Sequence, residues 1–130
     1  MTTIRSLVLR TAGINCDGET VRALELAGSD VDLVHLARVL EEPGRLDDVE
    51  VLVVPGGFSY GAYLAAGRVL GSALRHGLSH ELTAFGARAG FVLGICNGFQ
   101  VLLEAGLFEP GEERGIALTD NTSDRFECRW

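Results

Sequence analysis

Short apolar runs alternate with amphipathic segments along most of the chain. Three of these runs are mostly apolar, and one of them, residues 51–54, is continuous and mostly β-branched, as is typical of a strand buried on both faces of a sheet. A fourth run alternates apolar and polar residues before it turns apolar. We therefore predict four strands, at residues 6–9, 31–36, 51–54 and 91–95.

The segments between these strands carry apolar residues at helical spacing. The predicted helices cover residues 17–28, 63–75, 79–89 and 97–105. Asp17 is placed to cap the first helix and Gly28 to end it, and Ala89 is expected on the inner face of the third. Strands that alternate with helices predict an α/β domain with a mainly parallel sheet and helices on both faces.

The remaining segments give weaker patterns. Residues 41–48 are predicted as a charged connector and residues 109–115 as a polar loop. Residues 116–118 and 125–130 are predicted as short strands, because apolar and charged residues alternate in the second of them.

Three loops follow strand ends and are the candidates for a functional site. They cover residues 11–17, 55–61 and 96–98. Binding sites of parallel sheets form beyond the carboxyl ends of the strands. We therefore expect the three loops to meet in one crevice.

Cys96 lies in the run Gly94-Ile95-Cys96-Asn97-Gly98-Phe99-Gln100, where a strand meets a helix. The pattern Gly-x-Cys-x-Gly is the thiol form of the nucleophile elbow, in which flanking glycines allow a sharp turn. The positive end of the following helix favours a thiolate. A buried structural cysteine is the alternative interpretation, but the glycines and the strand-to-helix context favour a nucleophile.

A second loop, Pro55-Gly56-Gly57-Phe58-Ser59-Tyr60-Gly61, follows the central strand. It lacks the spacing and the lysine of a phosphate-binding loop, and a plain tight turn is the simplest alternative. Glycines at this position can leave backbone amides pointing into the crevice. Opposite Cys96, the loop predicts an oxyanion hole formed by the amides of Gly57 and Asn97.

The overall composition bears on the expected classes of partner and on the cellular location. The 130 residues carry a net charge of −7, and all eleven basic residues are arginines. An acidic chain without basic clusters argues against nucleic-acid binding. No apolar run reaches transmembrane length and no metal-ligand spacing occurs. Three widely separated cysteines fit the reducing cytoplasm, so we expect a cytoplasmic protein with no membrane, nucleic-acid or metal partner.

With both loops in view, the chain resembles the class I glutamine amidotransferases, in the subfamily that supplies ammonia for purine biosynthesis. The resemblance rests on the glycine loop, the elbow and the tail Asn121-x-Ser123-x-Arg125-Phe126-Glu127-Cys128-Arg129-Trp130, and Asn15-Cys16-Asp17 agrees with it. Asn97 and Phe99 point to this subfamily, because related amidotransferases tend to carry leucine and histidine there. The implied fold is flavodoxin-like.

The resemblance implies a glutaminase mechanism. The Cys96 thiolate attacks the side-chain amide of glutamine, ammonia leaves as the thioester forms, and water then releases glutamate from the thioester. Gln100, Gly56 and Phe58 are the implied substrate-binding residues. The ammonia passes to a large synthetase subunit, which uses ATP and magnesium to convert formylglycinamide ribonucleotide to formylglycinamidine ribonucleotide. A small third subunit is a further implied partner, and no cofactor is expected in this chain.

Two departures from the family pattern bear on activity. The family continues the glycine loop as Gly-Asp-Tyr-Leu-Arg-Ala-Gly, whereas this chain has Ala62 and Ala65 in place of the acid and the base. The family's catalytic His-x-Glu motif lies well downstream of the cysteine, and no His-x-Glu occurs in these 130 residues. His35, His76 and His80 are interpreted as structural or surface residues.

These departures leave three hypotheses for a single domain over residues 1–130, truncated before the part that carries His-x-Glu. The first is glutamine hydrolysis for purine synthesis. The second is a catalytically incomplete fragment or a non-catalytic module that binds the large synthetase subunit. The third, a thiol hydrolase or chaperone with a related sheet, ranks last because such proteins usually lack the tail. An uncovered sheet edge is expected to favour self-association or dependence on a partner.

The tail itself has two interpretations. Asn121, Ser123 and Arg125 are consistent with a turn closed by polar side chains and followed by a strand. The resemblance instead implies that the segment lies near the glutamine site or the partner-binding face.

Overall fold

The computed structural model describes residues 3–62, 67–108 and 116–129 and contains one four-stranded parallel sheet in the order β2-β1-β3-β4. The strands are β1 (Arg5–Arg10), β2 (Asp30–His35), β3 (Val51–Val54) and β4 (Phe91–Gly94). Val8 of β1 lies between Leu33 of β2 and Val53 of β3, and Leu93 of β4 lies beside Val53. The four strands and their parallel arrangement confirm the prediction.

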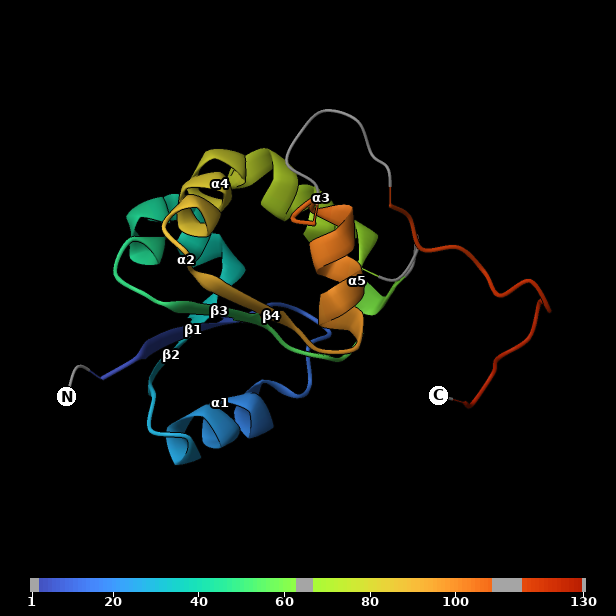
Figure 1. Ribbon diagram of the computed structural model, residues 1–130, viewed down its shortest axis with the longest axis horizontal. Helices are drawn as coiled ribbons and strands as arrows, with labels where there is room; N and C mark the ends of the chain where they lie inside the picture. The colour runs from blue at the N-terminus through green and yellow to red at the C-terminus, as the bar shows by residue number, and fades with distance from the viewer. Residues whose placement is uncertain (1–2, 63–66, 109–115, 130) are drawn as a thin grey trace.

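Helices cover both faces of the sheet, as predicted (Figure 1). Helix α1 (Asp17–Leu26) packs against β1 and β2 on one face. The other face carries α2 (Leu36–Glu41), α3 (Arg68–Gly77), α4 (Ser79–Ala87) and α5 (Asn97–Glu104). Two short 3₁₀ helices, η1 (Pro43–Leu46) and η2 (Ser59–Ala62), lie in the connections. Within the described ranges, no helix has the length and apolar character needed to cross a bilayer.

The main core lies between the sheet and the helices α2 to α5. Its side chains are almost all aliphatic, with Phe85 as the aromatic exception, and the sheet contributes Leu7, Leu9, Leu52 and Val54. Full burial of one such side chain contributes roughly 1.5–3 kcal/mol. This layer therefore fixes the strand ends from which the candidate site loops emerge.

Several element boundaries differ from the sequence prediction. The sequence pattern predicts no helix at α2 and gives no assignment for residues 37–40, because a six-residue helix with only Leu36 and Val39 buried gives no clear period. Asp17 lies in the first turn of α1 rather than at its N-cap, and pairs with Arg10 at 3.2 Å. Ala89 lies beyond the end of α4 with a φ of +62°, so it is not on the inner face of that helix.

The start of α3 and the tail also differ from the sequence prediction or lie partly outside the described residues. Helix α3 begins at Arg68, and residues 63–66, where the prediction began the helix, lie outside the described residues. The predicted strands at 116–118 and 125–130 are wrong for the part that the structure describes, since residues 116–129 form no strand. Ile116, Leu118 and Phe126 are exposed there. An alternating pattern forms a strand only where a neighbouring strand pairs with it, and no described strand does.

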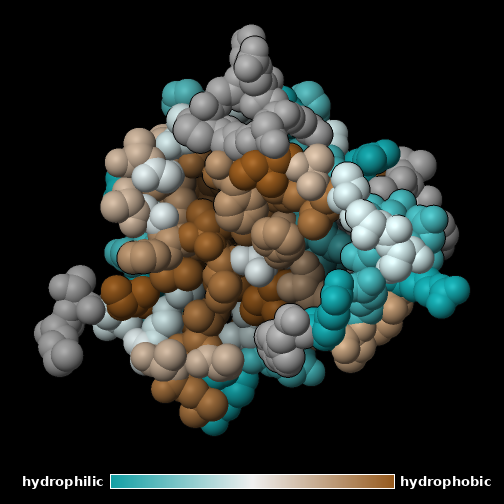
Figure 2. Space-filling model, turned by 45° about the vertical axis from the view of Figure 1, so that its right-hand side comes forward, coloured by the Kyte–Doolittle hydropathy of each residue, from teal (hydrophilic) through white to brown (hydrophobic). Residues whose placement is uncertain are grey.

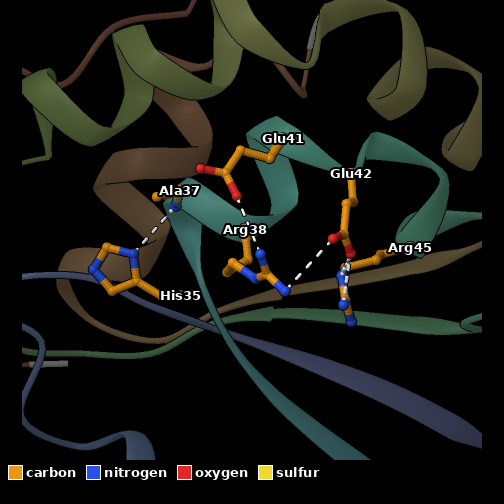
Figure 3. Close-up of polar contacts among 6 residues, drawn as sticks. All are labelled: His35, Ala37, Arg38, Glu41, Glu42 and Arg45. Carbon is orange, nitrogen blue, oxygen red and sulfur yellow. Dashed lines mark hydrogen bonds and ion pairs between the residues drawn. The ribbon is translucent and has the colours of Figure 1, made fainter.

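His35 has a structural role at the end of β2 (Figure 3). Its Nδ1 accepts a hydrogen bond from the backbone N–H of Ala37 at 3.2 Å and thereby caps α2. Strand β2 is separated from β4 by β1 and β3, which places it roughly 14 Å away at the usual strand spacing. His35 therefore does not reach Cys96, in agreement with its interpretation as a structural residue. The exposed ion pairs of Arg38 and Arg45 beside it contribute little to stability.

The α1 side of β4 is open. Val92 packs against the main core, so Phe91 and Leu93 point to the opposite face, where α1 covers β1 and β2. Phe91 is 73% exposed and Leu93 46% exposed. Figure 2 shows apolar residues gathered on the side of the molecule that carries β4 and α5. Within the described residues, β4 is also an outer strand of the sheet, as the predicted uncovered edge requires.

We expect this open face to cause self-association, and Phe91→Glu to reduce it. The side chain is mostly exposed, so the substitution should change the free energy of unfolding by less than about 0.5 kcal/mol, while a charge on the outer strand opposes edge-to-edge pairing. Sedimentation velocity across a concentration series measures the effect. Phe126→Glu is the matched control, because Phe126 is 89% exposed but lies in the tail. A wild-type chain that stays monomeric at concentrations on the order of 0.1 mM would contradict the expectation.

Candidate active site

The loops that follow β1 and β3 are joined directly by backbone contacts. The N–H of Phe58 donates to the carbonyl of Gly13 at 2.7 Å, and the N–H of Tyr60 donates to that of Ala12 at 2.8 Å. Ile14 and Gly57 form an isolated antiparallel bridge. A Cβ on Gly13 would lie 1.9 Å from the Phe58 carbonyl oxygen, so only glycine permits this approach. Two of the three predicted loops therefore meet, as expected.

The third loop, the elbow, is held against the end of β3. The N–H of Ile95 donates to the Val54 carbonyl at 3.1 Å, continuing the sheet beyond β4. A Cβ on Gly98 would lie 1.9 Å from the same carbonyl oxygen, so the first turn of α5 touches the strand backbone. A Cβ on Gly56 would lie 3.5 Å from the Cβ of Cys96. The three loops thus converge at the carboxyl edge of the sheet, which confirms that they meet as predicted.

Cys96 occupies a strained turn between β4 and α5. Its φ of 53° and ψ of −112° belong to a region that residues with a side chain rarely adopt, and such a conformation costs about 1–3 kcal/mol. The thiol is free and exposed at the N-terminus of α5. A strained, exposed cysteine between a strand and a helix is the geometry predicted for a nucleophile elbow, and it excludes the interpretation as a buried structural cysteine.

The two backbone amides predicted to form an oxyanion hole lie in the elbow and in the glycine loop. Asn97 is the first residue of α5, where helix amides lack an intrahelical acceptor. Gly57 has a φ of +132°, which favours glycine. Within the described part of the chain, neither amide donates a hydrogen bond to another residue. Both are available to a ligand, and their role as oxyanion donors stays a prediction.

The side chain of Asn97 forms a contact that the sequence analysis missed. Its Oδ1 accepts hydrogen bonds from the Ser59 hydroxyl at 2.7 Å and from the Ser59 N–H at 3.2 Å. Its Nδ2 donates to Oε1 of Gln100 at 3.0 Å. Asn97 and Ser59 are 4% and 3% exposed. The only sequence signal was the asparagine itself at a position where related amidotransferases tend to carry leucine.

Other predicted site residues are placed less centrally. Phe58 is 66% exposed beside the glycine loop, and its role in substrate binding stays a prediction, as does that of Gly56. Ala65 lies outside the described residues, and so does the side chain of Ala62. The described tail extends away from the sheet (Figure 1). Among the described residues, no cluster of His, Cys, Asp or Glu is arranged to hold a metal ion.

The tail forms the polar turn that was one of its two interpretations. The side-chain amide of Asn121 donates to the Arg125 carbonyl at 2.8 Å, and the Ser123 hydroxyl donates to Glu127 at 2.7 Å. No strand follows this turn within residues 116–129. In this structure the segment does not approach Cys96.

The parallel sheet and the elbow agree with the class I glutamine amidotransferase fold, and comparison with known proteins shows the family. The sequence matches the family model of the CobB/CobQ-like glutamine amidotransferase domain over residues 3–130, and the chain belongs to this family. The phosphoribosylformylglycinamidine synthase subunit PurQ of Dehalococcoides mccartyi is 46% identical to it over 133 residues, which cover 100% of this chain and 52% of the relative. PurQ of Thermotoga maritima is 39% identical, over 97% of this chain and 52% of the relative.

A solved structure supports the same assignment. The structure of PurLQS from Thermotoga maritima contains a chain that aligns with a TM-score of 0.72 and 36% identity, covering 99% of this chain and 54% of that one. The comparisons confirm the resemblance and the class I amidotransferase-like fold. The chain spans about half the length of the relatives that it matches.

Proposed function

We propose that this chain is a glutamine amidotransferase component of phosphoribosylformylglycinamidine synthase, with Cys96 as its nucleophile. The observation that carries the proposal is the exposed Cys96 thiol on a strained strand-to-helix turn, in a chain 46% identical to a PurQ subunit. Acyl transfer needs a thiolate and fixed hydrogen-bond donors around it. In this proposal the elbow supplies the sulfur nucleophile, and the amides of Asn97 and Gly57 supply the donors.

The chemistry follows from the groups at this edge of the sheet. The Cys96 sulfur bonds to the carboxamide carbon of glutamine, and the negative charge that forms on the oxygen is stabilised by the Gly57 and Asn97 amides. The amide nitrogen gains the proton that the Cys96 thiol has lost, the carbon–nitrogen bond breaks and ammonia leaves. Water attacks the thioester carbon, the carbon–sulfur bond breaks and glutamate is released. Loss of one oxyanion donor costs roughly 3–4 kcal/mol of the activation barrier in comparable enzymes.

The ammonia is proposed to serve a large synthetase subunit, which uses ATP and magnesium to form formylglycinamidine ribonucleotide. The match to a chain of PurLQS supports an assembly with further subunits, and a small third subunit is proposed among them. Three free cysteines support a place in the reducing cytoplasm.

A second candidate function is a non-catalytic module that binds the synthetase subunit. It is favoured by the positions of the histidines: His35 caps α2, and His76 and His80 are exposed around the junction of α3 and α4. Within the described ranges, no histidine is therefore placed to protonate the leaving ammonia. Under this function the fold and the assembly remain while hydrolysis is lost.

Release of glutamate from glutamine distinguishes the two functions. The purified chain is assayed alone and with the large synthetase subunit of the Dehalococcoides mccartyi enzyme, and Cys96→Ala is the blank in both. Glutamate release above that blank in either setting supports the proposed glutaminase. Complex formation without glutamate release would establish the binding module instead.

A further inference from the structure

The buried Asn97 side chain links the two loops of the candidate site through a short chain of hydrogen bonds. The chain runs from Ser59 in the glycine loop, through the Asn97 amide, to Oε1 of Gln100 in the second turn of α5. Asn97 and Ser59 are both buried. Hydrogen bonds shielded from water hold their partners more firmly than exposed ones, so the orientation of each group matters.

The backbone of Ser59 fixes the direction of the whole chain. A backbone N–H can only donate, so the oxygen of the Asn97 amide must face Ser59 and its nitrogen must face Gln100. The Asn97 nitrogen in turn can only donate, so Gln100 must present its oxygen to Asn97. The Gln100 nitrogen, Nε2, is thereby turned away from Asn97.

Among the residues that the structure describes, the Nε2 group of Gln100 has no hydrogen-bond partner and is available to a ligand. No fully buried side-chain nitrogen or oxygen among those residues lacks a partner. Gln100 is half-buried, so part of the residue reaches solvent. The backbone N–H of Gln100 donates to the Cys96 carbonyl at 3.4 Å, so Gln100 lies one helical turn after the nucleophile.

We propose that Asn97 is a positioning residue that sets the orientation of the Gln100 amide, so that Nε2 donates to an acceptor oxygen of the glutamine substrate. The inference rests on the proposed function and adds to it. Asn97 acts through its side chain here, in addition to the backbone amide predicted for the oxyanion hole. Ser59, which has no predicted contact with substrate, becomes the anchor of the arrangement.

Asn97→Asp tests the proposal because the side chain keeps its shape while the donor nitrogen Nδ2 is replaced by an acceptor oxygen. A carboxylate accepts from both Ser59 and Gln100, so the Gln100 amide turns over and its nitrogen points inward. The half-saturating concentration of a chloroketone analogue of glutamine should rise at least about tenfold, the loss of one good hydrogen bond. An unchanged half-saturating concentration would overturn the proposal.

A double-mutant cycle separates positioning from a general structural effect. Gln100→Ala removes the donor itself and should raise the half-saturating concentration to a similar extent. Because Asn97 is proposed to act through Gln100, the combined Asn97→Asp and Gln100→Ala variant should be no weaker than Gln100→Ala alone. Additive effects would show that Asn97 acts independently of Gln100 and would overturn the proposal.

A measurement on the wild-type chain covers the case in which Asn97→Asp does not fold or the chain is not labelled. Side-chain amide protons observed by nitrogen-15 NMR should exchange slowly with water for Asn97 and rapidly for Gln100. This outcome does not depend on glutaminase activity, so failure of the proposed function leaves it readable. Fast exchange at Asn97 together with protection at Gln100 would overturn the inferred orientation.

Discussion

A chloroketone analogue of glutamine is expected to modify Cys96 and to leave Cys16 and Cys128 unmodified. The thiolate attacks the carbon that bears chlorine, a sulfur–carbon bond forms and chloride leaves. All three cysteines are free and exposed, so exposure alone does not select among them. Only Cys96 lies on the elbow next to the glycine loop. This is the place where glutamine, and therefore its analogue, is proposed to bind.

Intact-mass and peptide-mass spectrometry measure this selectivity. One equivalent should be incorporated, excess glutamine should slow the incorporation, and Cys96→Ala should reduce it to background. Cys16→Ala and Cys128→Ala are the matched controls and should label at the wild-type rate. Iodoacetamide, which has no glutamine shape, should modify all three positions. Equal labelling of Cys16 and Cys96 by the glutamine analogue would contradict the assignment of the nucleophile.

Gly98→Ala is expected to destabilise the fold strongly and to disrupt the elbow. The new Cβ would lie 1.9 Å from the Val54 carbonyl oxygen and 3.0 Å from that of Pro55. Both neighbours are backbone atoms in a buried strand end and cannot turn aside like a flexible side chain. Overpacking in a core typically costs 1–3 kcal/mol and occasionally more, and a direct backbone overlap places this site at about 3 kcal/mol or above.

Urea denaturation followed by circular dichroism measures the loss. Gly86→Ala is the control: it is also a glycine-to-alanine change, but it is expected to raise the free energy of unfolding. Gly86 lies in α4, and its added Cβ meets no atom within 4 Å. Replacing such a helical glycine with alanine stabilises by about 0.5–1 kcal/mol. A Gly98→Ala chain as stable as the wild type would mean that α5 does not rest on β3 as described.

The strands and the elbow could be predicted because their signals are local. Residues 51–54 are continuously apolar and β-branched, and the sheet places them in its interior. Gly94, Cys96 and Gly98 carry the turn in the sequence itself. Each of these positions is determined by its own backbone and by burial, so one sequence was sufficient.

The parts that could not be predicted depend on contacts between distant segments. The hydrogen bond between Ser59 and Asn97 joins residues 38 positions apart, and neither residue type predicts that the other is its partner. Gly71 lowers the helix propensity of its segment, yet its added Cβ would lie 2.9 Å from the Val101 carbonyl oxygen, so the glycine allows α3 to approach α5 closely. The tail pattern at Phe126 failed for the converse reason, because a strand needs a neighbour that the pattern does not reveal.

The backbone conformation that presents the Cys96 thiol lowers the stability of the fold. With φ at 53° and ψ at −112°, glycine is the residue that this position would accept without strain, and Cys96→Gly should relieve part of the 1–3 kcal/mol that such conformations cost, about as much as one buried methylene contributes. In variants selected only for resistance to unfolding, glycine would therefore replace cysteine at position 96. Variants selected for ammonia supply would keep the thiol. The identity of this one residue would then reveal which requirement a lineage of such chains has been under.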